Sequence, residues 1–250
     1  MIKEYIAIRH DITPLCKLNT DIQILHDYNL SQEQLAIKKL KSGIVNDMTI
    51  QECQVLYSPS DTLSGDFYSI YKLNDGSVFL YLMDGQGHGI SPALTVFAIS
   101  SMLKQMIYSV SSLEEIVEQL AQSVKSFLGE EEQLAYTMIQ ISGDKKSISY
   151  SSAGMYPFLI KKDDEIIKIK ANNLLFMNFS PLPKIETLSI ENWDSLLIYS
   201  DGIVEHENDE IKHLSPEHLI SNSSNISSMI EIISSKKFDD DVTLIHLNNT

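Results

Sequence analysis

The stretch DFYSIYKLNDGSVFLYLMDG, residues 66–85, decides the fold, because it has the pattern of two strands joined by a tight turn. Each half is rich in aromatic and aliphatic residues, and the Asn-Asp-Gly between them is typical of a β-hairpin turn. Asp66 opens the first strand, and Asp84 stands near the end of the second. Because hairpin strands run antiparallel, the two carboxylates come to the same end of the pair.

The length of the turn fixes which residues face each other. With a three-residue turn, Asp66 lies directly opposite Asp84. With a two-residue turn, Asp66 faces Gly85, whose carbonyl oxygen is also a ligand for hard cations. Either register gathers oxygen ligands at one end of the hairpin. Two carboxylates that close repel each other, and a divalent cation between them is the simplest resolution.

The glycines after Asp84, in the run GQGHG at 85–89, do not fit a nucleotide-binding loop. Ile90 or Pro92, depending on where the motif starts, stands where a dinucleotide fingerprint needs its third glycine. The chain has no Gly-Lys-Ser/Thr of a P-loop, and no serine lies among these glycines to form a nucleophile elbow. What remains is a carboxylate at a strand end, followed by backbone free to turn a carbonyl toward a ligand. This arrangement is typical of a metal site.

The same pattern recurs twice further along the chain. An apolar strand pattern ends in Asp201-Gly202, and another begins after Asp239, Asp240 and Asp241. All the candidate ligands are oxygen donors, which selects Mg²⁺ or Mn²⁺ over zinc. Two such ions held close together can activate a bridging water for attack on a phosphoryl group.

The rest of the chain predicts an α+β fold with antiparallel sheets, because its strands cluster in hairpins and its helices stand apart. Strand patterns occupy residues 66–73, 77–84, 135–142, 147–152, 157–162, 166–170, 195–201 and 241–247. Helical patterns occupy residues 91–108, 112–128, 215–221 and 225–236. Ser91 is the expected N-cap of the first of these helices, with Pro92 in its first turn.

The first 50 residues have a different pattern. Leu15, Leu18, Ile22 and Leu25 form one helical stripe, which lapses at Asn29. The stripe fits a helix packed on its own domain as well as the seam of a homodimer. A capping box of Ser31 and Gln34 then predicts a second helix over residues 31–46.

Composition excludes some functions. The 250 residues carry a net charge of −15, which disfavours a large electrostatic contact with nucleic acid or an anionic membrane. The two cysteines, Cys16 and Cys53, have no metal-ligand spacing, and neither a signal peptide nor a run of 18 apolar residues is present. We therefore expect one main domain in a reducing, cytoplasmic setting.

Five segments resemble, in order and spacing, the SpoIIE-like branch of the metal-dependent protein phosphatases, the protein phosphatase 2C superfamily. They are SPSDTLSGDFYSI, FLYLMDGQGHGISPAL, YSSAGMYPFLI, LLIYSDGIVEH and FDDDVTLI, and the resemblance covers about residues 52–247. It implies a central β-sandwich with helices on both outer faces and two Mn²⁺ or Mg²⁺ ions at one end. It also implies removal of phosphate from serine or threonine of a protein, often a STAS-type anti-sigma antagonist in bacterial partner switching.

The resemblance assigns roles to individual residues. It implies metal ligation by Asp66, Asp84, the carbonyl of Gly85, Asp201 and Asp240, with Asp84 bridging the two ions. The four aspartates would then act in catalysis through a metal-activated water.

Two further positions have alternative roles. His88 is a candidate general acid toward the leaving alkoxide, and the alternative is a turn histidine bonded to backbone. Glu205 matches a family position just after the Asp-Gly of the YSDG motif, where a structural hydrogen bond is as plausible as catalysis. Asp241 stands where the family often has Asp or Asn.

Some positions depart from the family pattern. Ser69 replaces an acidic residue, and the segments LLFMNFSP at 174–181 and NWDS at 192–195 replace the usual Leu-Gly and Gly-Asp signatures. We expect these changes to alter a loop near the site, and hence substrate contacts, rather than the metal ligands.

The N-terminal EYIAIRHDIT, residues 4–13, resembles the closing strand of PAS sensor domains. The predicted organisation is a PAS-like strand at 1–14, connector and regulatory helices at 15–50, and the phosphatase domain at 51–250. The alternative for the N-terminus is an ordinary first strand and helix. The alternatives for function are a non-catalytic partner-binding module on the same fold and a phosphatase for a small metabolite.

Overall fold

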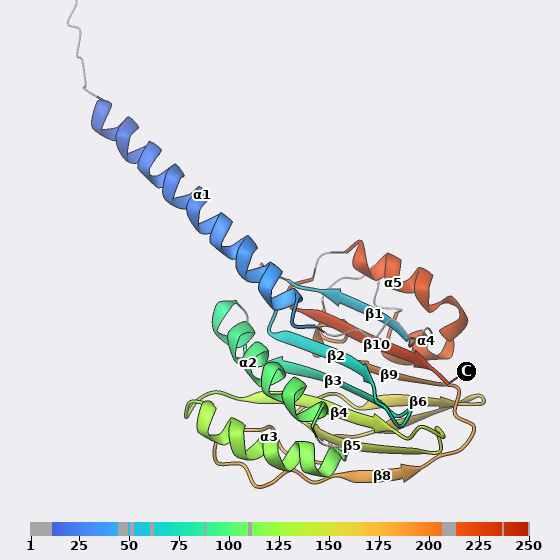
Figure 1. The fold of residues 1–250 in the computed structure, drawn as a ribbon. Coiled ribbons are helices and arrows are strands. Elements are labelled where there is room, and N and C mark those ends of the chain that lie inside the picture. The colour runs from blue at the N-terminus through green and yellow to red at the C-terminus, as the bar shows by residue number, and fades with distance from the viewer. Residues whose placement is uncertain are drawn as a thin grey trace, which may run out of the picture. The chain divides into compact units, whose positions relative to one another are not determined.

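The computed structural model describes residues 12–44, 50, 53–60, 63–87, 89–109, 112–206, 214–236 and 238–249. The chain forms two compact units, one reaching to Lys41 and the other beginning at Ser42. The first unit contains one helix, and the second contains two sheets with their covering helices (Figure 1).

Helix α1, Thr13–Lys41, runs without interruption for 29 residues. The predicted break at Asn29 and new start at Ser31 are therefore wrong. The Ser31 hydroxyl donates to the Tyr28 carbonyl at 2.6 Å, so its side chain bonds within the helix instead of capping a new one. The stripe Leu15, Leu18, Ile22 and Leu25 is exposed in this unit. Most of the PAS-like segment lies outside the described residues.

The second unit is built on two antiparallel five-stranded sheets (Figure 1). The first sheet has the order β1-β10-β9-β6-β7, with bounds Cys53–Ser58, Val242–Asn248, Ser195–Tyr199, Phe158–Lys162 and Glu165–Ile169. The second has the order β2-β3-β4-β5-β8, with bounds Asp66–Lys72, Val78–Gly85, Leu134–Ile141, Ser147–Ala153 and Glu186–Ser189. The sequence patterns missed β1 and β8, two edge strands with weak apolar patterning.

Helices cover the outer face of each sheet (Figure 1). Helices α2, Ile90–Ile107, and α3, Leu113–Phe127, pack on β2, β3 and β4. Helices α4, Pro216–Ser221, and α5, Ile226–Ser234, pack on the first sheet. The predicted α+β fold, an antiparallel sandwich with helices on both faces, is confirmed.

Strand β3 shows why the hairpin sequence is apolar almost throughout. Phe79, Tyr81 and Met83 face the helical layer, whereas Leu80 and Leu82 face the other sheet. Successive side chains of a strand point to opposite faces, so a strand buried on both faces has no polar alternation. The hairpin is therefore the centre of the fold.

The start of α2 differs from the prediction. Gly89 is the N-cap, with φ 97°, and Ser91 lies inside the first turn with its side chain exposed. A positive φ is accessible to glycine without strain, so the backbone turns sharply here before the helix begins. By length and composition, α2 is the one helix of the described chain that could cross a membrane. Its residues Val96, Ile99 and Leu103 are fully buried in the core.

The hairpin register is the one given by a three-residue turn. The Leu73 amide donates to the Ser77 carbonyl at 2.8 Å, and Gly76 closes the turn with φ 81°. Asp66 consequently pairs with Asp84 across β2 and β3. Of the two registers left open by the sequence, this one brings the carboxylates together.

His246 is a buried histidine in the middle of β10. It lies opposite Gln54 of β1 and Leu197 of β9 and is fully buried. Neither ring nitrogen has a hydrogen-bond partner among the described residues. Burial, with a smaller contribution from the Lys161 ammonium, lowers the pKa of His246 to about 4.

We predict that His246 makes the folded chain less stable in mild acid. Below pH 6.5 the unfolded chain binds a proton that the folded chain accepts only near pH 4. The free energy of unfolding should therefore fall as the pH drops from 6.5 toward 4, by about 1.4 kcal/mol per unit for this group. Urea unfolding at several pH values, compared between the native chain and His246→Leu, measures this difference. If the free energy of unfolding depended on pH equally in the two proteins, the lowered pKa of His246 would be contradicted.

Candidate metal centre

Four aspartates lie at one end of the sandwich because of where their strands begin and end. Asp66 is the first residue of β2, and Asp84 is the last but one of β3. Asp201 begins the short 3-10 helix η1, Asp201–Ile203, directly after β9. Asp240 precedes β10, which runs antiparallel to β9. The topology thus brings together residues that are far apart in the sequence.

Asp66 connects the two sheets. The Thr243 hydroxyl, on β10, donates to Asp66 Oδ2 at 2.6 Å. Thr243 is itself held by Ser200, since its amide donates to Ser200 Oγ at 2.9 Å and its carbonyl accepts from the Ser200 amide at 2.9 Å. The Asp66 carboxyl group therefore has a fixed orientation.

Burial and neighbouring negative charges raise the pKa of three of these carboxyl groups. Burial raises the pKa of Asp66 well above its usual value, and Asp84 raises it further. Burial, Asp201 and Asp240 raise the pKa of Asp84 to about 7. Burial also raises the pKa of Asp201, followed by the charges of Asp240 and Glu205. These groups repel one another, so a bound divalent cation would stabilise their ionised forms.

The donor chemistry fits a hard cation. The carbonyl oxygens of Gly85 and Gly87 turn toward Gly65, where a Cβ would lie 3.0 and 2.9 Å from them. Carboxylate and carbonyl oxygens are the ligands that Mg²⁺ and Mn²⁺ prefer. Within the described chain, no three acidic, histidine or cysteine side chains stand close enough to form a complete ligand set as they are.

Asp241 has a different role from its neighbour Asp240. Its Oδ1 accepts from the Ser60 amide at 2.7 Å and the Ser60 hydroxyl at 3.1 Å, and its Oδ2 accepts from the Gly65 amide at 2.6 Å. Asp241 is buried, whereas Asp240 is exposed. Asp241 thus ties the segment before β2 to the start of β10 and positions Asp66.

Sequence reasoning missed three residues that build this end of the sandwich: Gly65, Ser200 and Thr243. Gly65 leaves room for the carbonyl oxygens, and the two hydroxyl groups orient Asp66. All three stand next to or within the quoted SGDF, YSDG and FDDDVT motifs. Their place in the motifs was therefore a usable signal, although it does not specify their contacts.

Of the two candidates with alternative roles, Glu205 is described by the structure and His88 is not. Glu205 Oε1 accepts from the Tyr156 hydroxyl at 2.7 Å, which is the structural alternative considered for it. The same glutamate still acts on Asp201 through its charge. His88 lies outside the described residues, so its role as a general acid stays a prediction.

The two segments that depart from the family pattern lie at opposite ends of the sandwich. Phe176 exchanges two backbone hydrogen bonds with Leu134, at 2.9 and 3.0 Å, and Leu134 pairs with Gly85. The segment 174–181 therefore lies beside the site, as expected. The segment 192–195 does not, because Ser195 pairs with Asn248 at the far end of β10. For that segment the expectation is wrong, since β9 starts at the end remote from Asp201.

The comparisons with known proteins identify the family of this chain. The family model of Stage II sporulation protein E (SpoIIE) matches residues 74–249. The chain belongs to the SpoIIE family. The predicted resemblance to SpoIIE-like members of the metal-dependent protein phosphatase superfamily is thereby confirmed.

Relatives of this SpoIIE-family chain include one curated protein and several solved structures. The phosphoserine phosphatase RsbP of Bacillus subtilis (strain 168) is 29% identical over 76 residues, which are 30% of this chain and 19% of RsbP. The SiaA-PP2C domain of Pseudomonas aeruginosa superposes with a TM-score of 0.71 at 14% identity, over 90% of this chain and 99% of that one. RsbX in complex with magnesium superposes with a TM-score of 0.60 at 17% identity, over 78% and 92%. These structures share the fold.

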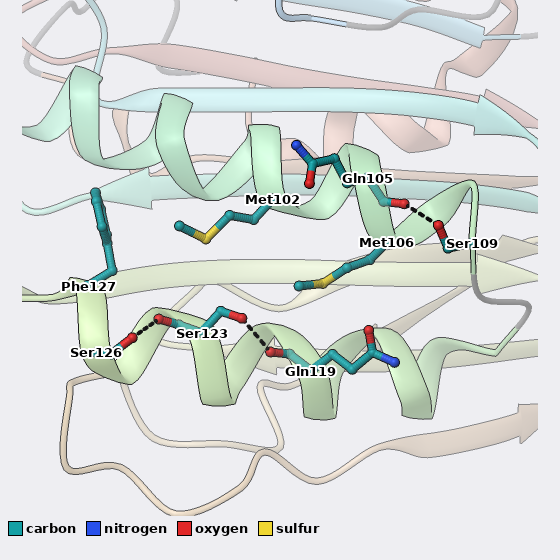
Figure 2. A pocket seen from close by; sticks show the side chains of 8 residues that line it. All are labelled: Met102, Gln105, Met106, Ser109, Gln119, Ser123, Ser126 and Phe127. Carbon is teal, nitrogen blue, oxygen red and sulfur yellow. Dashed lines mark hydrogen bonds between the residues drawn. The ribbon is translucent and has the colours of Figure 1, made fainter.

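The SpoIIE-family chain also has a large groove between α2 and α3, of about 530 Å³, which Figure 2 shows. Met102, Met106 and Phe127 supply its apolar surface. The hydroxyl groups of its serines donate to carbonyls of their own helices, as with Ser109 and Gln105 at 2.9 Å. None of its lining residues carries an acidic or basic side chain, so this groove offers no general acid or base.

We predict that Asp241→Ala destabilises the SpoIIE-family domain by about 3 kcal/mol. The substitution leaves the amides of Ser60 and Gly65 without their acceptor, and a buried unsatisfied amide costs about 1–3 kcal/mol. Urea unfolding measures the change. Asp239→Ala, at an exposed position two residues away, is the control and should change the stability by less than about 0.5 kcal/mol. Similar values for the two variants would refute the role of Asp241.

Proposed function

We propose that this chain is a metal-dependent phosphatase that removes phosphate from serine or threonine of a protein. The pairing of Asp66 with Asp84, at the end of the sandwich that Asp201 and Asp240 also reach, is the observation that carries the proposal. Family membership and the name of the relative RsbP, a phosphoserine phosphatase, support the same class of reaction.

The proposed ligands would hold two Mn²⁺ or Mg²⁺ ions. Asp66, Asp84, the Gly85 carbonyl, Asp201 and Asp240 would supply the protein's ligands. When bound, the ion pair supplies an activated water and neutralises charge on the phosphoryl oxygens.

The chain's own residues would orient this site. Thr243 holds the Asp66 carboxyl group, and Asp241 fixes the backbone at Gly65, so both ligand-bearing sheets keep a constant spacing. His88 would donate the proton that the leaving serine or threonine oxygen needs. Thr243 and Asp241 would thus act as positioning residues, and His88 would transfer a proton.

The biological setting is part of the proposal. The substrate would be a phosphorylated protein, of STAS type in a bacterial partner-switching pathway, in the cytoplasm and without a nucleic acid or membrane partner. Helix α1, Thr13–Lys41, would be the connector and regulatory helix ahead of the phosphatase domain, with the PAS-like segment before it. The exposed stripe of α1, Leu15 to Leu25, would form the seam of a homodimer.

The test of the activity is hydrolysis of p-nitrophenyl phosphate and of a phosphoserine peptide after removal of metal by a chelator. We predict that Mn²⁺ or Mg²⁺ restores turnover and that Asp84→Ala lowers kcat by about 1000-fold or more, because a proposed metal ligand is lost. Glu118→Ala removes an exposed acid of α3 and is the matched control, with unchanged turnover.

Calorimetric titration with Mn²⁺ separates the alternatives. Two ions per chain, lost in Asp84→Ala, are expected for the enzyme. A chain that binds no ion and hydrolyses no phosphoester would instead be a non-catalytic module, and the proposal would be wrong. Turnover of small phosphoesters without turnover of any phosphoprotein or phosphopeptide would indicate a metabolite phosphatase.

A further inference from the structure

A second groove, of about 390 Å³, lies beside η1 at the same end of the sandwich as the aspartates. It is lined by residues before β6, on β7, at the end of β9, in η1 and at the start of α4. Its lining includes Tyr156, Tyr199, Ile203, Val204, Lys168 and Glu217. This volume is in the range of pockets that bury small ligands or side chains, about 300–1,000 Å³.

The groove combines apolar side chains with one ion pair and the imidazole of His206. The rings of Tyr156 and Tyr199 lie with their centroids 6.3 Å apart, and Val204 is 40% exposed. At the rim, the Lys168 ammonium donates to the Glu217 carboxylate. Because this pair neutralises itself, the groove favours an apolar guest over a charged one.

Helix η1 links the groove to the proposed metal centre, because Asp201 begins this helix while Ile203 and the adjacent Val204 line the groove. The Val204 amide donates to the Asp201 carbonyl at 2.7 Å, the bond of a 3-10 turn. In that geometry side chains three residues apart lie on the same side, about 6 Å apart along the axis. Val204 therefore stands one turn from a proposed metal ligand, on the same side of the turn.

Hydrogen bonds link the wall of the groove to Asp201. Tyr156 donates to Glu205, the residue after Val204, at 2.7 Å. The Glu205 amide in turn donates to the Asp201 carbonyl at 2.9 Å. These bonds hold the groove and Asp201 in one arrangement, so little ordering is required when a ligand binds.

We propose that this groove receives a large apolar side chain of the phosphoprotein substrate, about two residues from the phosphoserine. The proposal rests on the proposed phosphatase function, which places the phosphate near Asp201. An extended peptide advances about 3.3–3.6 Å per residue, so two residues cover the distance to Val204. The groove thus selects substrates by the side chain that lies about two residues from the phosphoserine.

The first experiment is a scan of phosphoserine peptides. A single Phe is moved through positions −4 to +4 of an otherwise Ala/Ser peptide, and kcat/KM is measured with Mn²⁺. We expect a gain of about 10-fold or more at one position two residues from the phosphoserine, because burial of the Phe side chain favours binding. A flat profile, or a maximum far from these positions, overturns the proposal.

The second experiment places a charge in the groove. Val204→Asp should remove the preference for Phe, so that kcat/KM for the Phe peptide falls to that of the peptide without Phe. Ile232→Asp on α5 is the matched control, because Ile232 is a β-branched residue that is 48% exposed and lies outside the groove. A preference that survives Val204→Asp contradicts the assignment.

Controls distinguish failure of this proposal from failure of the proposed function. Thermal melting shows whether Val204→Asp is folded, and the milder Val204→Ser replaces it if it is not. Metal-dependent hydrolysis of p-nitrophenyl phosphate without any preference for Phe would refute the groove alone. If the native chain hydrolyses no phosphoester, the phosphatase function and the groove proposal both fail.

Discussion

The opposition of two carboxylates in an antiparallel hairpin is the constraint on which this structure depends. Asp66 and Asp84 pair directly across β2 and β3, at the point where both strands leave the sheet. The Asp84 charge adds to burial in raising the pKa of Asp66, and like charges so placed destabilise the fold unless another group compensates for them. The hydroxyl group of Thr243, on the other sheet, is one such compensation, and a divalent cation would be the larger one.

The second sheet supplies what the hairpin lacks. Asp201 and Asp240 come from the ends of β9 and β10, and Asp241 binds the backbone that leads into β2. These contacts cross the sandwich at its edge, where the core between the sheets ends. The same residues that bring acidic groups together therefore also hold the two sheets in register.

The sequence was sufficient for most of the fold, because strands with two buried faces and helices with clear caps have strong patterns. It was insufficient at Asn29, where the apolar stripe lapses although helix α1 continues. It was also insufficient for short edge strands such as β8, which have few apolar residues. The metal site followed from hairpin geometry together with the family motifs. The role of Asp241 did not, since two adjacent aspartates look alike in a sequence although one is buried and saturated with hydrogen bonds.

The turn at residues 74–76 has a consequence for how this chain tolerates evolutionary change. It lies at the opposite end of β2 from Asp66, about 20 Å away for a strand of this length. A single deleted residue in that turn would shift the pairing by one and direct every side chain of the shifted strand to the other face. Natural variation at this remote and solvent-exposed loop should therefore preserve its length far more strictly than its composition.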